Sequence, residues 1–125
     1  MALSIDTITI DCRDPKVAAG FWSAALGYRV VEIDENEAEI APLGPPGRPL
    51  LFQVVPEGKT VKNRWHLDLR PDRSMAHEVA RLEAAGATAL TRVEEGGSFW
   101  TVMADREGNE FCVLRGPEDG WSGEL

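Results

Sequence analysis

The chain has 125 residues, of which 43% are hydrophobic and 27% charged, the size and composition of one globular domain. Its formal net charge of −8 argues against a nucleic-acid partner and against binding to an anionic membrane, because both need clustered Lys and Arg. The first residues lack a signal-peptide pattern, no apolar stretch is long enough to span a bilayer, and the two cysteines show no disulfide or CxxC spacing. We therefore expect a cytoplasmic protein with reduced thiols.

The first half of the chain predicts a strand, a helix and three further strands. β-branched residues predict the first strand over residues 4–12. Asp14 and Pro15 are typical of a helix N-cap and first turn, and Gly27 is typical of the residue that ends a helix. The three later strands are expected over residues 28–33, 37–41 and 50–55.

The second half predicts the same order of elements. A strand is expected over residues 64–69, and Met75, Val79 and Leu82 mark the buried stripe of a helix that stops at Gly86. The three later strands are expected over residues 87–93, 98–104 and 109–114.

A constant shift of 59 residues superposes the two halves. It pairs Ile8 with Leu67, Ile10 with Leu69, Gly27 with Gly86, Phe52 with Phe111, and Val54 with Val113. We therefore predict a single α+β domain of two tandem βαβββ modules, over about residues 3–57 and 62–115, with a C-terminal tail over residues 116–125. The modules are expected to pair into a curved half-barrel sheet with the helices outside.

Alternation along the strands separates an apolar face, assigned to the helix side, from a face of mixed polarity. The polar members of the second face include Thr7, Gln53, His66, Asp68, Glu110 and Cys112. A concave face with a few polar groups among apolar ones is typical of a small-molecule site. The alternative is that these side chains simply fill the interior of a half-barrel.

Several segments carry a family resemblance. They are DCRDP, FWSAALGY, LLFQVVPEGK, NRWHLDL, RLEAAGA and FWTVMADREGNEFCVL. With them the chain, over about residues 3–115, resembles the glyoxalase, bleomycin-resistance and extradiol-dioxygenase (vicinal oxygen chelate) superfamily, above all its glyoxalase-like domains. The resemblance implies the fold predicted above. It also permits a role like that of relatives that sequester antibiotics.

The resemblance implies where a metal would bind. Metal-dependent members use His, Gln or Glu at four equivalent strand positions, which here hold Thr7, Gln53, His66 and Cys112. Threonine is not a normal ligand and glutamine is a weak one, and two ligands rarely suffice. We therefore expect no catalytic metal or other cofactor, with a divalent ion as the less favoured alternative.

Two further side chains are candidates for chemistry or ligand contact. His66, with Asp68 on the same face, could act as an acid or base near neutral pH, or could be a histidine satisfied by its neighbour. Trp100 could stack on a flat ligand, or could be a core or dimer contact.

The sequence leaves three hypotheses about function open. The favoured one is a metal-free protein that binds a small organic molecule in a cavity lined by Gln53, His66 and Asp68, and possible ligand contacts are Thr7, Gln53, His66, Trp100 and Cys112. The second is a lyase or other enzyme that uses a divalent metal or His66 as acid or base, with His66, Asp68 and Glu110 as catalytic candidates. The third is a structural or regulatory module with a filled interior. A homodimer is expected because many relatives place their cavities at or near a dimer interface.

Overall fold

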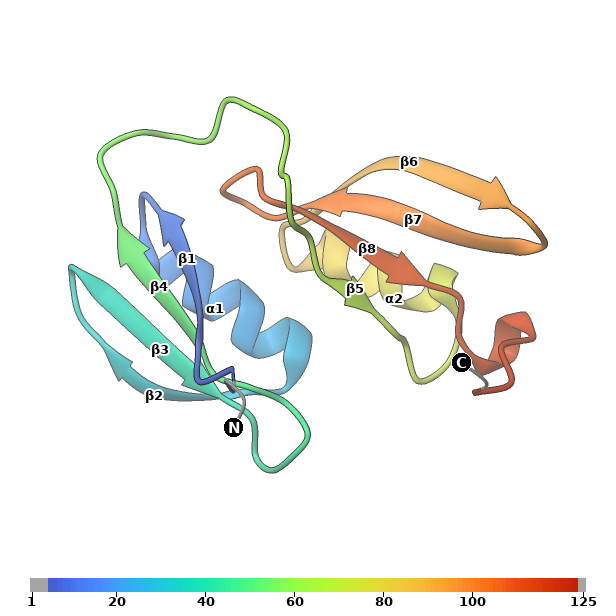
Figure 1. Ribbon diagram of the computed structural model, residues 1–125, viewed down its shortest axis with the longest axis horizontal. Coiled ribbons are helices and arrows are strands. Elements are labelled where there is room, and N and C mark those ends of the chain that lie inside the picture. Colours follow the sequence, from blue (N-terminus) through green and yellow to red (C-terminus); the bar gives the residue numbers. More distant parts are fainter. Residues whose placement is uncertain (1–4, 124–125) are drawn as a thin grey trace, which may run out of the picture. The chain divides into compact units, whose positions relative to one another are not determined.

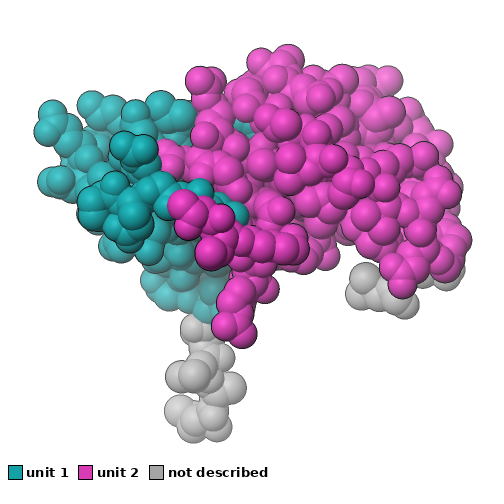
Figure 2. All heavy atoms as spheres, turned by 90° about the horizontal axis from the view of Figure 1, so that it is seen from above, with its two compact units in different colours: residues 1–59 teal, residues 60–125 magenta. Residues whose placement is uncertain are grey.

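The computed structural model describes residues 5–123 of the chain. The chain divides into two compact units, unit 1 over residues 1–59 and unit 2 over residues 60–125 (Figure 2). Neither helix in the described part of the chain has the length and apolarity needed to cross a lipid bilayer.

Unit 1 is one helix on an open four-stranded sheet (Figure 1). Its elements are β1 (Ile8–Cys12), α1 (Pro15–Leu26), β2 (Arg29–Ile33), β3 (Glu37–Ala41) and β4 (Leu50–Val54). The strand order is β1-β4-β3-β2, with β1 parallel to β4 and the other pairs antiparallel. The helix begins where Asp14 accepts hydrogen bonds from the backbone N–H groups of Lys16 and Val17, and it ends at Gly27, whose φ is 69°.

Unit 2 has the same architecture. Its elements are β5 (Asp68–Leu69), α2 (Met75–Ala84), β6 (Thr88–Glu95), β7 (Ser98–Ala104), β8 (Glu110–Leu114) and the short 3-10 helix η1 (Pro117–Asp119). The strand order is β5-β8-β7-β6, with β5 parallel to β8. The predicted α+β fold of two βαβββ modules is therefore confirmed, with two helices and two open, mixed four-stranded sheets.

One face of each sheet is buried under its helix. In unit 1, Ile40 and Phe52 are inaccessible to solvent, and α1 covers β2, β3 and β4 with Phe21 and Trp22 among its buried residues. In unit 2, Met103, Phe111 and Val113 are buried on the side where α2 contacts β6, β7 and β8. These buried positions alternate along the strands with the residues of the opposite face, which is of mixed polarity.

A β-bulge at equivalent positions supports the internal duplication. The β2–β3 register shifts between Val30 and Glu32, and the β6–β7 register shifts between Ala89 and Thr91. The two irregularities are separated by the same 59 residues that superpose the sequences. Because a bulge inserts one extra residue at a defined place, its repetition shows that the modules share backbone detail as well as element order.

The constant shift is wrong for the first strand of each module. Ile10 pairs with Phe52, but Leu69, its counterpart at a shift of 59, pairs with Val113 instead of Phe111. The first strand of unit 2 is thus displaced by two residues relative to the constant shift. The connection between this strand and its helix accommodates the displacement, because it spans residues 70–74 in unit 2 and only residues 13–14 in unit 1. Since the displacement is even, every side chain keeps its face.

Two expected strand boundaries are also corrected. The strand expected over residues 64–69 is reduced to β5. The segment before β5 contacts β8 through the N–H of Asn63, which donates to Oε1 of Glu110, and through the carbonyl oxygen of Leu67, which accepts from the N–H of Cys112. The strand expected over residues 4–12 begins at Ile8. Residue 4 lies outside the described residues.

The segment expected to be a plain tail is anchored to α2. Oδ2 of Asp119 accepts hydrogen bonds from the N–H of Met75 (2.6 Å), at the start of α2, and from the N–H of Gly116 (2.9 Å). These two bonds lower the pKa of the Asp119 carboxyl. The guanidinium of Arg70 lies 4.1 Å from the ring centroid of Trp121, which adds a cation–π contact. Residues 124–125 of the expected tail lie outside the described residues.

We expect Asp119→Ala to lower the free energy of unfolding by about 1–2 kcal/mol, because two backbone donors lose a charged acceptor. Since the pKa of Asp119 is lowered on folding, the difference between parent and variant is full above the carboxyl pKa of the unfolded chain and shrinks as the pH falls through the lowered value. Urea unfolding at several pH values measures it. Glu118→Ala, which removes only a surface ion pair to Arg73, is the control and should cost less than about 1 kcal/mol. A pH-independent loss in Asp119→Ala would contradict this assignment.

Candidate functional site

The face of the unit 2 sheet opposite α2 carries a pocket of about 450 Å³. Its lining residues are Lys62, His66, Asp68, Ser98, Trp100, Val102, Glu110, Cys112 and Leu114. Alternate residues of β7 and β8 contribute to it, which explains why it lies opposite the buried residues under α2. A pocket of this size, with apolar walls and a few convergent polar groups, has the dimensions of a small-molecule site.

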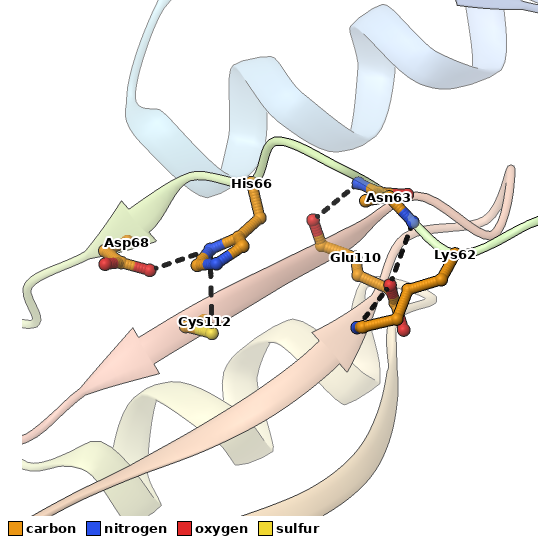
Figure 3. Close-up of polar contacts among 6 residues, drawn as sticks. All are labelled: Lys62, Asn63, His66, Asp68, Glu110 and Cys112. Atoms are coloured by element: carbon orange, nitrogen blue, oxygen red, sulfur yellow. Dashed lines mark hydrogen bonds and ion pairs between the residues drawn. The ribbon is translucent and has the colours of Figure 1, made fainter.

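His66 and Asp68, which both line this pocket, lie within ion-pair distance of each other (Figure 3). Nδ1 of His66 lies 3.0 Å from Oδ1 of Asp68, and the two side chains are 48% and 54% exposed. An ionised carboxylate can only accept, so this contact is favourable when Nδ1 carries a proton. In the neutral ring, Nε2 is then the acceptor, which is the arrangement that a general base requires.

Cys112 lies beneath the same imidazole. Its Sγ is 3.9 Å from Nδ1 of His66, and its side chain is buried on β8. Burial raises the pKa of the Cys112 thiol, and the negative charge of Asp68 and a hydrogen bond with it raise it further. A thiol with a raised pKa is protonated near neutral pH, so this arrangement does not activate Cys112 as a nucleophile.

Glu110 holds the segment that leads into the site. Its Oε1 accepts from Nζ of Lys62 (3.0 Å) and from the N–H of Asn63 (3.3 Å), and its backbone oxygen accepts from Nδ2 of Asn63 (3.1 Å) (Figure 3). The Glu110 side chain is 18% exposed in the ion pair. These contacts favour a positioning role for Glu110, since its carboxylate fastens residues 62–63 to β8.

The register of β5 explains why these groups meet. Asp68 pairs directly with Cys112 in the parallel ladder of unit 2. In unit 1, Asp11 has the same place opposite Gln53, which is the equivalent of Cys112. A constant shift of 59 residues would have put Arg70, the counterpart of Asp11, opposite Cys112. The displacement of two residues therefore places a carboxylate beside the thiol where a guanidinium would otherwise lie.

The structure brings most of the predicted site residues together. Those that line the pocket of unit 2 are His66, Asp68, Trp100, Glu110 and Cys112. The other two belong to unit 1: Thr7 precedes β1 and donates a hydrogen bond to Asp6 (2.8 Å), and Gln53 is exposed on β4. Neither lines this pocket, and their predicted ligand contacts stay predictions.

Lys62, Ser98 and Val102 also line the pocket but were not singled out from the sequence. For Ser98 and Val102 the sequence does carry a signal, which is the alternation of faces along β7: they lie on the face opposite the buried Met103. No comparable signal marks Lys62, which lies in a connecting segment and joins the site through Glu110.

Comparison with known proteins gives a family match and several structural matches. The family model for the glyoxalase-like domain matches residues 7–114. No curated protein sequence matches the chain significantly.

Three solved structures with a similar fold have TM-scores between 0.64 and 0.76. A mutant of the genomically encoded fosfomycin resistance protein FosX from Listeria monocytogenes, complexed with Mn(II) and 1S,2S-dihydroxypropylphosphonic acid, has a TM-score of 0.76 at 12% identity, over 93% of this chain and 92% of that one. A glyoxalase-related enzyme from Fulvimarina pelagi has a TM-score of 0.69 at 19% identity, over 93% and 90%. A lactoylglutathione lyase from Agrobacterium tumefaciens has a TM-score of 0.64 at 16% identity, over 94% and 97%. At these identities the likeness concerns the fold.

Proposed function

The chain belongs to the glyoxalase-like domain family, and from this premise we propose that it binds a small organic molecule in the pocket of unit 2. The observation that carries the proposal is the lining of that pocket. Trp100, Val102 and Leu114 provide an apolar wall, and His66 and Asp68 provide a polar pair at its edge. A planar molecule with one polar group matches this division, since its face stacks on Trp100 and its polar group bonds to the pair.

We propose that this binding uses no catalytic metal, which is also the expectation from the sequence. Of the residues predicted to line the cavity, His66 and Asp68 line this pocket of unit 2. Gln53 and Thr7 belong to unit 1 and stay proposed ligand contacts. As in the sequence-based expectation, we propose that the protein is cytoplasmic and forms a homodimer. Sedimentation at the mass of a 13.7 kDa monomer across the micromolar range would contradict the dimer.

A second candidate function is an enzyme that uses His66 as an acid or base. The specific observation in its favour is the 3.0 Å contact between Nδ1 of His66 and Asp68, which orients the ring and leaves Nε2 as the acceptor. Structural neighbours include a fosfomycin resistance protein and a lactoylglutathione lyase. Their reactions are candidates to assay, with His66→Gln as the variant that should abolish turnover if this function is the right one.

The binding proposal predicts a saturable ligand whose affinity depends on Trp100. In a chemically diverse panel of planar aromatic compounds tested by ligand-observed NMR and tryptophan fluorescence, we expect binders whose affinity falls about tenfold in Trp100→Leu. The reason is that leucine keeps the apolar bulk but loses the ring on which a flat ligand stacks.

Trp65→Leu is the matched control, because Trp65 is 91% exposed and does not line the pocket. It should leave the affinity unchanged. Equal affinities in Trp100→Leu and the parent, or the absence of any saturable binder in the panel, would overturn the proposal.

A further inference from the structure

The charged side chains that line the pocket of unit 2 are unequal in sign. Asp68 and Glu110 each contribute a carboxylate and Lys62 contributes an ammonium group, while His66 adds no charge as long as its imidazole is neutral. The pocket therefore carries an excess of negative charge, and it does so in a chain whose formal net charge is −8. The local and the overall charge both attract a cationic ligand and repel an anionic one.

The two carboxylates differ in how available they are to a ligand. Oε1 of Glu110 lies 3.0 Å from Nζ of Lys62, and the Glu110 side chain is 18% exposed, so these two charges offset each other within the protein. Asp68 is 54% exposed, and within residues 5–123 it forms no ion pair with a Lys or Arg side chain. It contacts the His66 imidazole at 3.0 Å and shares a hydrogen bond with the Cys112 thiol. Since a carboxylate has about four acceptor positions, Asp68 can accept further bonds from a ligand.

Charged and apolar side chains lie at opposite ends of the pocket. Along β8 the pocket face carries Glu110, Cys112 and Leu114 in turn. Asp68 pairs with Cys112 in the middle of this row, and Trp100 of β7 pairs with Leu114 at the apolar end. Two strand spacings across and two residues along the sheet put the backbones of Asp68 and Trp100 about 12 Å apart. A flat ring stacked on Trp100 can therefore carry a substituent that points toward Asp68.

The aromatic wall favours the same sign of ligand charge. The face of an indole is electron-rich and attracts a cation that lies over it, so Trp100 binds a positively charged ring better than a neutral one of the same shape. An amidinium or guanidinium group presents N–H donors in one plane, and this arrangement matches the two oxygens of a carboxylate such as Asp68. A planar cation can thus use both side chains at once, whereas a neutral ring gains mainly the stacking.

We propose that the ligand of this pocket is a planar aromatic cation, which stacks its ring on Trp100 and donates its charged N–H groups to Asp68. The charged group is an amidinium, a guanidinium or a protonated amine attached to the ring. This ligand class rests on the proposed function, because it assigns the charge of the organic molecule that the pocket binds. Aromatic anions of the same size are excluded by the two carboxylates.

The test compares three probes that share one ring and nearly one shape but differ in charge. They are naphthamidine, a cation, naphthamide, which is neutral, and naphthoate, an anion, all substituted at the same ring position. Isothermal titration calorimetry at about pH 8, where histidine side chains are generally neutral, measures their Kd values. We expect naphthamidine to bind about tenfold more tightly than naphthamide, and naphthoate to bind more weakly than both. Added NaCl should weaken the binding of naphthamidine and leave that of naphthamide unchanged.

Asp68→Asn tests the carboxylate that the proposal assigns. It keeps the size of the side chain and removes its charge, so the affinity for naphthamidine should fall about tenfold while that for naphthamide is retained. Because Asp68 is exposed, the variant should fold, and circular dichroism verifies this. Asp72→Asn is the matched control: it changes the net charge by the same amount, but Asp72 is exposed and does not line the pocket. It should leave the ratio of the two affinities unchanged.

The outcomes separate this ligand class from the proposed function. If naphthamide or naphthoate binds as tightly as naphthamidine, the pocket still binds an organic molecule, and only the preference for a cation is overturned. A preference that survives in Asp68→Asn, or that is lost equally in Asp72→Asn, would overturn the role of Asp68. Failure of all three probes to bind up to millimolar concentration would also overturn the ligand class. The proposed function is overturned with it only if the wider panel of planar aromatic compounds yields no saturable binder either.

Discussion

Phe111→Ala is expected to lower the free energy of unfolding by about 3–5 kcal/mol. Phe111 is 1% exposed, lies on β8 and pairs with Met103 of β7, on the face that α2 covers. Removing its ring leaves a cavity lined by other large buried side chains, and a strand held on both sides cannot collapse into it. Because a domain of this size has a total stability of about 5–15 kcal/mol, the variant should lose a large part of its margin.

Phe99→Ala provides the matched control for this prediction. Phe99 lies on β7, is only partly buried and contacts the guanidinium of Arg92 at 4.6 Å from its ring centroid. Loss of this contact and of partly buried area should cost about 1–2 kcal/mol. Urea unfolding with fitted m-values measures both variants. Similar losses at Phe99 and Phe111, or a loss below about 1 kcal/mol at Phe111, would show that the core is not where the structure places it.

Local chemistry made most of the fold predictable from the sequence. Asp14 and Gly27 mark the ends of α1 because one caps the first turn and the other adopts a positive φ, and both effects act within a few residues. The strand faces followed from alternation, which placed Phe111 under a helix and Cys112 opposite it. The repeat then extended each local inference to its counterpart in the other module.

The register of β5 could not be predicted in the same way. A slip of one residue reverses the faces of a strand and conflicts with the hydrophobic pattern, but a slip of two residues leaves the pattern unchanged. The sequence therefore placed His66, Asp68 and Cys112 on one face without indicating that Asp68 lies beside Cys112. That pairing brings the carboxylate and the thiol together, so the most distinctive feature of the candidate site follows from a long-range choice of register.

The anchoring of the C-terminal segment was missed for a related reason. Glycine and proline in residues 116–125 are typical of an irregular segment, and nothing in that composition indicates a partner. The contacts depend on residues more than forty positions earlier, where the N–H of Met75 and the carbonyl of Arg73 meet Asp119 and Glu118. Unit 2 thus includes this segment in its fold.

Gly116→Ala is expected to lower the free energy of unfolding by about 2–4 kcal/mol. Gly116 is buried where the chain leaves β8, and its φ of −107° is accessible to any residue, so backbone strain is not the cause. The cause is contact: a Cβ at this position would overlap the carbonyl oxygen of Arg73 and lie 2.9 Å from its carbonyl carbon. Backbone atoms cannot move aside as a flexible side chain can, so the segment must separate from the start of α2 and lose the bonds of Asp119.

Gly20→Ala should have the opposite sign and is the control. Gly20 lies in α1, and a Cβ there meets nothing within 4 Å, so alanine should raise the free energy of unfolding by about 0.5–1 kcal/mol through its helix propensity. Thermal and urea unfolding of the two variants compare the same added methyl group at a crowded and an open position. If Gly116→Ala were as stable as the parent, residues 116–121 would not be packed against α2 in solution. The loss predicted for Asp119→Ala would then disappear as well, because both depend on that contact.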